Sequence, residues 1–162
     1  MNLNKLFSMQ EILDDRIEKQ HNLHNVSLIN KKILALIVEL GELANETRCF
    51  KFWSKKSPSS KEVILEEYVD CLHFILSIGL YNEYLDIELN SLNYTDSNLT
   101  DLFLILNLSI SNFINNQSKE NYVNIFSNFL FLGKLLGFTP TDIEAAYISK
   151  NEINHERQDQ GY

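Results

Sequence analysis

Apolar residues recur every three or four positions along most of the chain, which is the spacing of one face of an α-helix. Residues 2–20 show it clearly, with Leu3, Leu6, Met9, Leu13 and Ile17. The same spacing runs from about Leu28 to Phe52 and again over residues 60–81. We therefore expect three helices, joined by the polar stretches HNLHN and SKKSPSS. Ser59 and Glu62 form a capping-box pattern at the start of the third helix.

The second half of the chain continues the helical pattern after one interruption. Residues 82–98 are rich in Asn, Ser and Asp, which indicates a loop or short turns of helix. Residues 99–116 include LNLSIS, which alternates like a strand, but the flanking leucines and the length of the segment favour a helix. Another helix is expected over residues 120–136, with Gly137 as the residue that follows its end. Thr139 and Pro140 predict the start of a last helix that runs to roughly Glu156.

These elements predict an all-α fold, a helical bundle of about five to six helices. The 162 residues correspond to a single domain that spans residues 1–162. A chain of this size can bury well over half of the surface that it exposes when unfolded. The 5 glycines and 2 prolines are few for a turn-rich β fold, which supports the helical interpretation.

Charge and composition exclude several classes of protein. The formal net charge is -8, which disfavours a nucleic-acid partner because phosphate backbones require Lys and Arg. The two cysteines, Cys49 and Cys71, fit neither a disulfide framework nor a zinc site. The N-terminus has no continuous apolar segment of a signal peptide, and no apolar run reaches the length of a membrane span. We expect a cytoplasmic protein without a membrane partner.

Two acidic motifs stand out against this helical background. Glu39-Leu-Gly-Glu42 and Glu67-Tyr-Val-Asp70 each place two carboxylates three residues apart, on one face of a helix. Most such pairs are solvated helix faces. Here, however, an apolar run ends at Glu39 and another begins after Asp70, which favours partial burial. If the two helices pack together, four carboxylates converge.

A cluster of four carboxylates requires protons or cations. Two unit charges about 5 Å apart repel by roughly 3 kcal/mol at an effective dielectric constant near 20. Oxygen ligands suit Mg²⁺ or Mn²⁺ rather than zinc, so the motifs indicate metal-assisted chemistry on an anionic substrate. Glu66 lies about 100° round the helix from Glu67 and is interpreted as a solvated neighbour. A carboxylate-bridged di-iron bundle is an alternative: Asp70-x-x-His73 fits half of its pattern, but Asn45 replaces the second histidine after Glu42.

With these residues in view, the chain resembles the all-α dimeric dUTPases, within the all-α nucleoside triphosphate pyrophosphohydrolases. That superfamily shares an ExxE motif followed by an ExxD motif. Further similarity lies in MQEILDD near the N-terminus, CFKFWSKK after the first acidic motif, DCLHFILSIGL from Asp70, and the C-terminal YISKNEINHERQDQGY. The resemblance spans nearly the whole chain, although residues 82–135 add little beyond helical character.

The resemblance implies Mg²⁺-dependent hydrolysis of dUTP to dUMP and pyrophosphate by a homodimer, with Mn²⁺ able to substitute. Glu39, Glu42, Glu67 and Asp70 would hold the metal ions. A metal-bound water would attack a phosphorus atom, and Glu39 is the residue that we expect to act as its base.

The resemblance also implies a set of substrate-binding residues. Lys150, Arg157 and Tyr162 would bind phosphate oxygens, and Asn154 would add a hydrogen bond. Gln10 and Asp14 would contact uracil, Phe50 or Trp53 would cover the base, and His73 with Phe74 would pack against the deoxyribose. Taken singly, Trp53, Phe74 and His73 also fit ordinary packing roles, and Lys150, Asn154 and Arg157 also fit a surface stripe. Asp14 departs from the Asn of many relatives, and a carboxylate accepts hydrogen bonds but donates none.

Two other functions remain open on the sequence. One is pyrophosphohydrolysis of another nucleotide, such as dCTP or a nucleotide with a damaged base. The other is a non-catalytic helical interaction or regulatory protein.

Overall fold

The computed structural model describes residues 1–92 and 98–161. Over these residues the chain forms six α-helices and no strand, so the predicted all-α class is confirmed. The helices are α1 (Leu3–Gln20), α2 (Ile29–Thr47), α3 (Lys61–Tyr81), α4 (Leu99–Asn115), α5 (Lys119–Leu135) and α6 (Pro140–Asp159). The ambiguous segment after residue 98 is helical, as its length predicted.

Local capping chemistry sets several helix ends as expected. Thr139 caps α6, where its side chain accepts from the Asp142 backbone N–H and Asp142 accepts in return from the Thr139 N–H. Gly137 follows the end of α5 with φ of 79°, the left-handed conformation that glycine adopts without strain. Residues 82–92 are free of helix, in agreement with the expected loop, and the rest of that prediction falls partly on residues 93–97, outside the described part.

Two predicted boundaries were wrong. Helix α2 ends at Thr47 rather than Phe52, because Arg48 adopts a left-handed conformation with φ of 57° and stops the helical hydrogen-bond ladder. The Thr47 hydroxyl donates to the Ala44 carbonyl at 2.8 Å in the same turn. Helix α3 is capped by Ser60 instead of Ser59, whose hydroxyl binds the Glu46 carboxylate at the end of α2.

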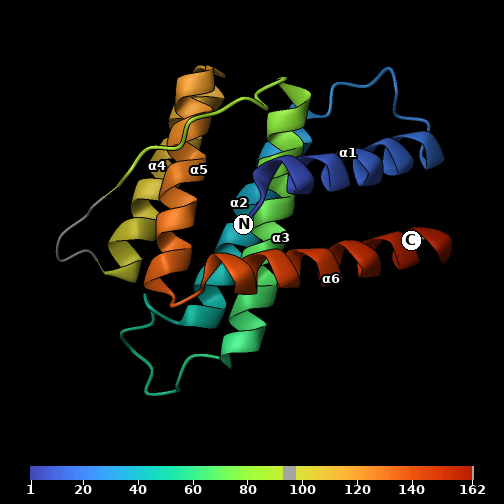
Figure 1. Cartoon of the computed structure of the whole chain (residues 1–162). Helices are drawn as coiled ribbons and strands as arrows, with labels where there is room; N and C mark the ends of the chain where they lie inside the picture. The colour runs from blue at the N-terminus through green and yellow to red at the C-terminus, as the bar shows by residue number, and fades with distance from the viewer. Residues whose placement is uncertain (93–97, 162) are drawn as a thin grey trace.

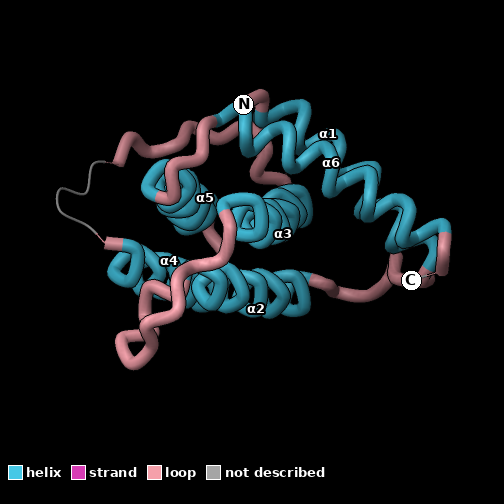
Figure 2. Tube along the Cα trace, turned by 90° about the horizontal axis from the view of Figure 1, so that it is seen from below, coloured by secondary structure: helices cyan, strands magenta, loops and turns pink. Residues whose placement is uncertain are grey.

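Helix α3 lies at the centre of the fold. It contacts α1, α2, α5 and α6, and α4 packs beside α5 (Figure 1). Seen from below, α1 and α6 run alongside each other and extend beyond the rest of the bundle (Figure 2). The helices α1 and α6 run in the same direction, since Asn2 contacts Glu144 near their starts and Arg16 contacts Asp159 near their ends (Figure 1). Together they form an arm next to the α2–α3 pair.

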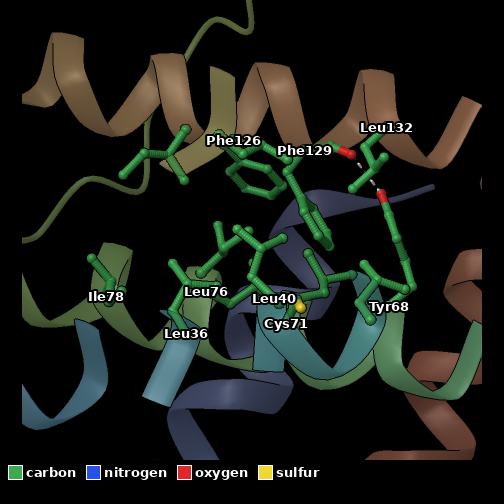
Figure 3. Close-up of a cluster of buried hydrophobic side chains, with 14 of the residues drawn as sticks. Leu36, Leu40, Tyr68, Cys71, Leu76, Ile78, Phe126, Phe129 and Leu132 are labelled. Carbon is green, nitrogen blue, oxygen red and sulfur yellow. Dashed lines mark hydrogen bonds between the residues drawn. The ribbon is translucent and has the colours of Figure 1, made fainter. Parts of the chain in front are cut away.

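The core fills the space between α2, α3 and α5. Tyr68, Phe126 and Phe129 are completely buried there, with Leu36 and Leu40 of α2 facing them (Figure 3). The Tyr68 ring stacks on Phe129 with centroids 4.2 Å apart, and its hydroxyl donates to the Phe129 carbonyl at 3.1 Å. Burial of these large side chains, at about 25 cal/mol per Å² of apolar surface, fixes the relative position of α2 and α3.

Other sequence expectations concern thiols and membranes. Both cysteines are free, with Cys71 buried and Cys49 partly buried. Among the described residues, no helix combines the length and the apolar character needed to cross a membrane.

The contact between α3 and α5 yields a stability prediction. A Cβ at Gly133 would lie 2.5 Å from the Tyr68 hydroxyl oxygen and 2.7 Å from its Cζ. We therefore expect Gly133→Ala to lower the free energy of unfolding by about 1–3 kcal/mol, measured by urea denaturation. In a Tyr68→Phe background the same change should cost less, because the closest atom is gone. Equal costs in both backgrounds would contradict this contact.

Candidate active site

Packing of α2 on α3 brings the two acidic motifs together. Carboxylate oxygens of Glu39, Glu67 and Asp70 all lie within 4.8 Å of one another, and each of these residues is partly buried. Glu42 is exposed and is not part of this group, although its charge acts on both Glu39 and Glu67. The geometry thus gathers three of the four predicted carboxylates, with the fourth at the edge. His73 lies outside the group, which removes the nitrogen ligand that a di-iron site would need.

Burial and mutual repulsion act strongly on these acids. Burial, followed by the charges of Asp70, Glu42 and Glu67, raises the pKa of Glu39 to about 7. Burial is also the main cause that raises the pKa of Glu67, with Asp70 and Glu42 adding to it. Because the pKa of Glu39 lies near neutrality and that of Glu67 is raised as well, the cluster is short of positive charge. It is therefore suited to bind a cation.

Lys150 of α6 is the cation that the chain itself brings to the cluster. Its Nζ donates to Asp70 Oδ2 at 2.7 Å and to Glu66 Oε1 at 2.9 Å. Burial alone would lower the pKa of Lys150, but the hydrogen bonds to Asp70 and Glu66 raise it. The pKa of Asp70 is nevertheless raised, because its burial outweighs the lysine. Glu66 is exposed, as the sequence suggested, but its position on α3 turns it toward α6 and gives it an ion pair with Lys150 that the sequence did not indicate.

The acids open into a cleft of about 290 Å³ between α1, α2, α3 and α6. Eight predicted site residues line it: Gln10, Asp14, Glu39, Asp70, His73, Phe74, Asn154 and Arg157. On α6, Arg157 Nη1 donates to Asn154 Oδ1 at 3.4 Å. One wall therefore carries carboxylates, and α6 brings positive charge to the same space.

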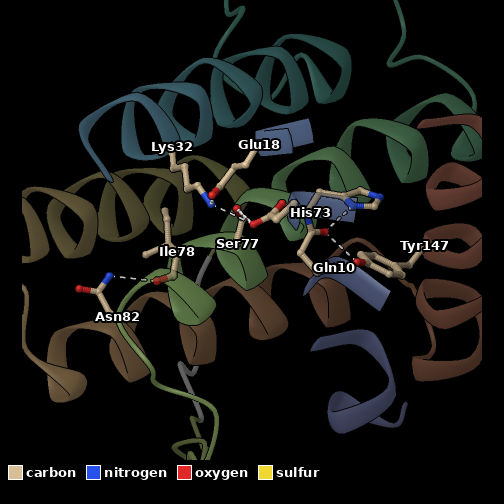
Figure 4. Close-up of polar contacts among 9 residues, drawn as sticks. Gln10, Glu18, Lys32, His73, Ser77, Ile78, Asn82 and Tyr147 are labelled. Carbon is tan, nitrogen blue, oxygen red and sulfur yellow. Dashed lines mark hydrogen bonds and ion pairs between the residues drawn. The ribbon is translucent and has the colours of Figure 1, made fainter. Parts of the chain in front are cut away.

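The other end of the cleft is organised around the buried amide of Gln10. Its Oε1 accepts from the Tyr147 hydroxyl at 2.8 Å and lies 2.7 Å from His73 Nδ1 (Figure 4). Its Nε2 donates to Asp14 Oδ1 at 2.7 Å. Because the amide oxygen faces it, His73 Nδ1 must carry the hydrogen, which leaves Nε2 as an acceptor. Burial lowers the pKa of His73 to about 3, so the ring is neutral.

Asp14 links this network to α2 and α3. Its Oδ2 accepts from Lys32 Nζ at 2.9 Å and from the Ser77 hydroxyl. Lys32 also faces Glu18 at 3.6 Å, as Figure 4 shows. The Asp14 carboxylate is therefore held between donors from three helices.

Comparison with known protein families identifies the family of this chain. A family model described as dUTPase matches residues 2–162. The chain belongs to the dUTPase family. No curated protein matches the chain. Membership supports dUTP diphosphatase activity, a hydrolase reaction on a nucleotide, and the six-helix fold agrees with the all-α dimeric dUTPases. It argues against a purely non-catalytic interaction protein.

Two residues that the dUTPase resemblance implied lie elsewhere. Phe50 and Trp53 are not in the cleft, because α2 ends before them and both fall in the following loop. Their rings contact each other edge-on at 6.0 Å between centroids, and Trp53 is 65% exposed. Tyr162 lies outside the described residues.

Sequence reasoning missed three residues of the polar network beside this dUTPase cleft: Lys32, Ser77 and Tyr147. Tyr147 precedes Lys150 by three positions and Ser77 follows His73 by four, so helical spacing from predicted residues could have indicated both. Lys32 carries no such signal, since only the crossing of α1 and α2 brings it to Asp14.

The raised pKa of Glu39 predicts how stability depends on pH. The folded protein binds this proton up to about pH 7 and the unfolded chain only up to about 4.5, so the Glu39 charge destabilises the fold increasingly as pH rises between these values. Glu39→Gln should therefore stabilise the metal-free protein at pH 8 by on the order of 1 kcal/mol, an amount reduced by solvent screening. It should give no gain at pH 4.

Thermal unfolding in EDTA across this pH range measures the effect. Glu152→Gln, at an exposed position on α6, is the matched control and should show no such pH-dependent gain. Identical curves for Glu39→Gln and wild type at pH 8 would contradict the clustering of the carboxylates.

Proposed function

We propose that this chain hydrolyses dUTP to dUMP and pyrophosphate with Mg²⁺, and that Mn²⁺ can substitute. The observation that carries the proposal is the convergence of Glu39, Glu67 and Asp70 beside a cleft that Glu39, Asp70 and Arg157 line, with Lys150 paired to Asp70. The dUTPase family matches this chain along its length. Because the match spans residues 2–162 and the cleft draws on both ends of the chain, we treat residues 1–162 as one functional unit.

The donor set fits a hard divalent cation. Glu39, Glu67 and Asp70 offer oxygen ligands only, which suits Mg²⁺ and disfavours zinc. Glu42, one turn along α2 from Glu39, would complete the set. Bound there, Mg²⁺ supplies positive charge to triphosphate oxygens and makes a nearby water more acidic. The raised pKa values of Glu39 and Glu67 support the fit, since they reflect burial and, after it, negative charge that the protein does not neutralise by itself.

Glu39 is our proposed general base. Burial and the neighbouring carboxylates raise its pKa to about 7 in the metal-free protein, which makes it a stronger base than an ordinary carboxylate. It would accept the proton of the water that attacks phosphorus. Asp70, held by Lys150, would stay in place as a ligand while Glu39 exchanges its proton.

The remaining residues would bind the rest of the substrate. Lys150 and Arg157 would bring positive charge to the phosphate oxygens. The Tyr162 hydroxyl and the Asn154 amide would donate hydrogen bonds to them. His73 and Phe74 line the cleft and would pack against the deoxyribose, where a 2′-hydroxyl has least room.

Of the four residues proposed to contact uracil, two line the cleft and two do not. Gln10 and Asp14 line the cleft and would meet the base. Neither Phe50 nor Trp53 lines the cleft of the single chain. They would cover the base only if their loop moves, or if the loop of a second subunit supplies them.

Pyrophosphate release from dUTP tests the proposed reaction. We expect saturable release with Mg²⁺ and none in EDTA. Glu39→Gln should lower kcat by at least about 100-fold, as loss of a general base does, whereas Glu152→Gln should keep the wild-type rate. A panel with dCTP, dTTP and dATP ranks the substrates. If another nucleotide is turned over faster than dUTP, the substrate assignment is wrong.

We also propose a homodimer. Leu34 and Val38 of α2 and Leu104 and Leu108 of α4 are at least half exposed, and α2 packs against α4. Together they make one apolar face that a second copy could cover. Gly41 continues this side of α2, and a Cβ there would meet no atom within 4 Å, so a partner's backbone could approach closely.

Leu104→Glu tests the dimer. A charge in the buried interface should convert the protein to a monomer in light scattering at micromolar concentration, because an unpaired buried charge costs several kcal/mol. Ile12→Glu is the matched control, since Ile12 is 63% exposed and Leu104 is 65% exposed. If the wild type is already monomeric, or if both variants stay dimeric, this interface is wrong. A cytoplasmic location and the lack of a nucleic-acid partner stay predictions.

A further inference from the structure

A second cavity of about 260 Å³ adjoins the cleft on the side away from the acids. The two cavities share Asp14, Ile17, Phe74 and Ser77, so a ligand can extend from one into the other. None of the clustered carboxylates lines the second cavity, whose walls include Leu28, Ala35 and the stem of Lys32. An apolar slot next to an ionic cleft matches the two ends of a nucleotide, with the base in the slot.

One polar row borders the two cavities: Gln10 lines the cleft, Lys32 lines the slot, and Asp14 lines both. Asp14 stands between two donors, Gln10 Nε2 at 2.7 Å on one oxygen and Lys32 Nζ at 2.9 Å on the other. An amide NH₂ carries two hydrogens and an ammonium carries three, so each can donate beyond Asp14. The Asp14 carboxylate has further lone pairs to accept with. The row Gln10–Asp14–Lys32 therefore offers donor, acceptor and donor in sequence.

The row is fixed before any ligand binds. The Gln10 amide cannot flip, because its oxygen would then face the Asp14 carboxylate and its NH₂ would face the Tyr147 and His73 donors. The Lys32 side chain is only 12% exposed and lies between Asp14 and Glu18. Such preorganisation removes the need to order these side chains when a base enters.

We propose that Lys32 determines base specificity: with Gln10 and Asp14 it forms a donor–acceptor–donor row that reads the imide edge of uracil. This inference rests on the proposed hydrolysis of dUTP. Uracil presents O4, N3–H and O2, which are acceptor, donor and acceptor, and every position pairs with the row. Cytosine presents an amino donor and two acceptors, so in either orientation two of its three groups face a like group. Lys32 thus supplies the donor that Asp14 lacks.

A matched pair of variants isolates the donor. Lys32→Met removes the charge and the N–H groups, whereas Lys32→Gln removes the charge but keeps an N–H donor. We expect Lys32→Met to lower kcat/KM for dUTP by roughly 10- to 100-fold, mainly through KM, since the contact exists in the bound ground state. The ratio of kcat/KM for dUTP over dCTP should fall by at least about tenfold.

Lys32→Gln should keep most of that ratio, and Lys19→Met, an exposed lysine on α1, should keep all of it. A ratio that Lys32→Met leaves unchanged would overturn the inference. So would an equal loss of the ratio in Lys32→Gln and Lys32→Met, because charge alone would then explain it.

A substrate analogue tests the same row if Lys32→Met does not fold. 3-Methyl-dUTP carries a methyl group in place of the N3 hydrogen, so its N3 cannot donate a hydrogen bond to the Asp14 carboxylate. Wild-type protein should turn it over at least about tenfold less efficiently than dUTP, because a buried acceptor is left unpaired. Equal efficiency for the two substrates would contradict the row.

Binding without metal separates this inference from the proposed reaction. In EDTA, calorimetry should show that wild type prefers 2′-deoxyuridine over 2′-deoxycytidine and that Lys32→Met loses the preference. If that holds while no nucleotide releases pyrophosphate, the reaction is wrong and the role of Lys32 stands. If dUTP is hydrolysed but Lys32→Met keeps the wild-type preference, the reaction stands and the role of Lys32 is wrong.

Discussion

The contact of Lys150 with Asp70 and Glu66 ties the active-site cleft to the rest of the fold. Carboxylates at the junction of α2 and α3 are driven together by apolar packing behind them, and their repulsion opposes that packing. Lys150 is the buried counter-charge that α6 contributes. Since α6 also packs along α1, these two ion pairs link the carboxylate cluster, the C-terminal helix and the Gln10 network of α1.

The lysine does not neutralise the whole cluster. It pairs with Asp70 and Glu66, but the pKa of Glu39 still rises to about 7 and that of Glu67 is raised as well. The fold thus keeps a deficit of positive charge on one side of the cleft. That deficit lowers the stability of the metal-free protein, and the same deficit would provide the affinity for a divalent cation. Stability and function oppose each other at these residues.

At the other end of the cleft, Gln10 and His73 are positioned by the direction of their hydrogen bonds rather than by ion pairs. Asp14 orients the Gln10 amide, Gln10 selects the tautomer of His73, and stacking of His73 on Tyr147 at 4.2 Å holds the ring in place. The hydrogen-bond role of Asp14 thus sets the orientation of Gln10, which in turn sets which nitrogen of His73 carries the hydrogen. In the proposed recognition of uracil, the carboxylate at position 14 would rely on these neighbours for the hydrogen-bond donors that it lacks.

The sequence predicted the elements well and the contacts between elements less well. Helical spacing located six helices and the acidic pairs, because periodicity is a local property of the chain. The end of α2 was missed since the apolar residues continue past Arg48, where the backbone turns left-handed. Glu66 and Lys32 were missed for a different reason: their partners lie on α6 and α1, far away in the chain, and no local pattern encodes a crossing of helices.

The most direct test of the central claim is a Mn²⁺ titration followed by electron paramagnetic resonance, with the wild type compared to Glu67→Gln. Glu67 contributes an oxygen to the cluster but is not the proposed base, so its loss tests the cation site by itself. The account predicts saturable Mn²⁺ binding by the wild type that is at least about tenfold weaker in Glu67→Gln, since one of few charged ligands is lost. Equal Mn²⁺ affinity in the two proteins, or no binding by the wild type even with a non-hydrolysable dUTP analogue, would contradict it.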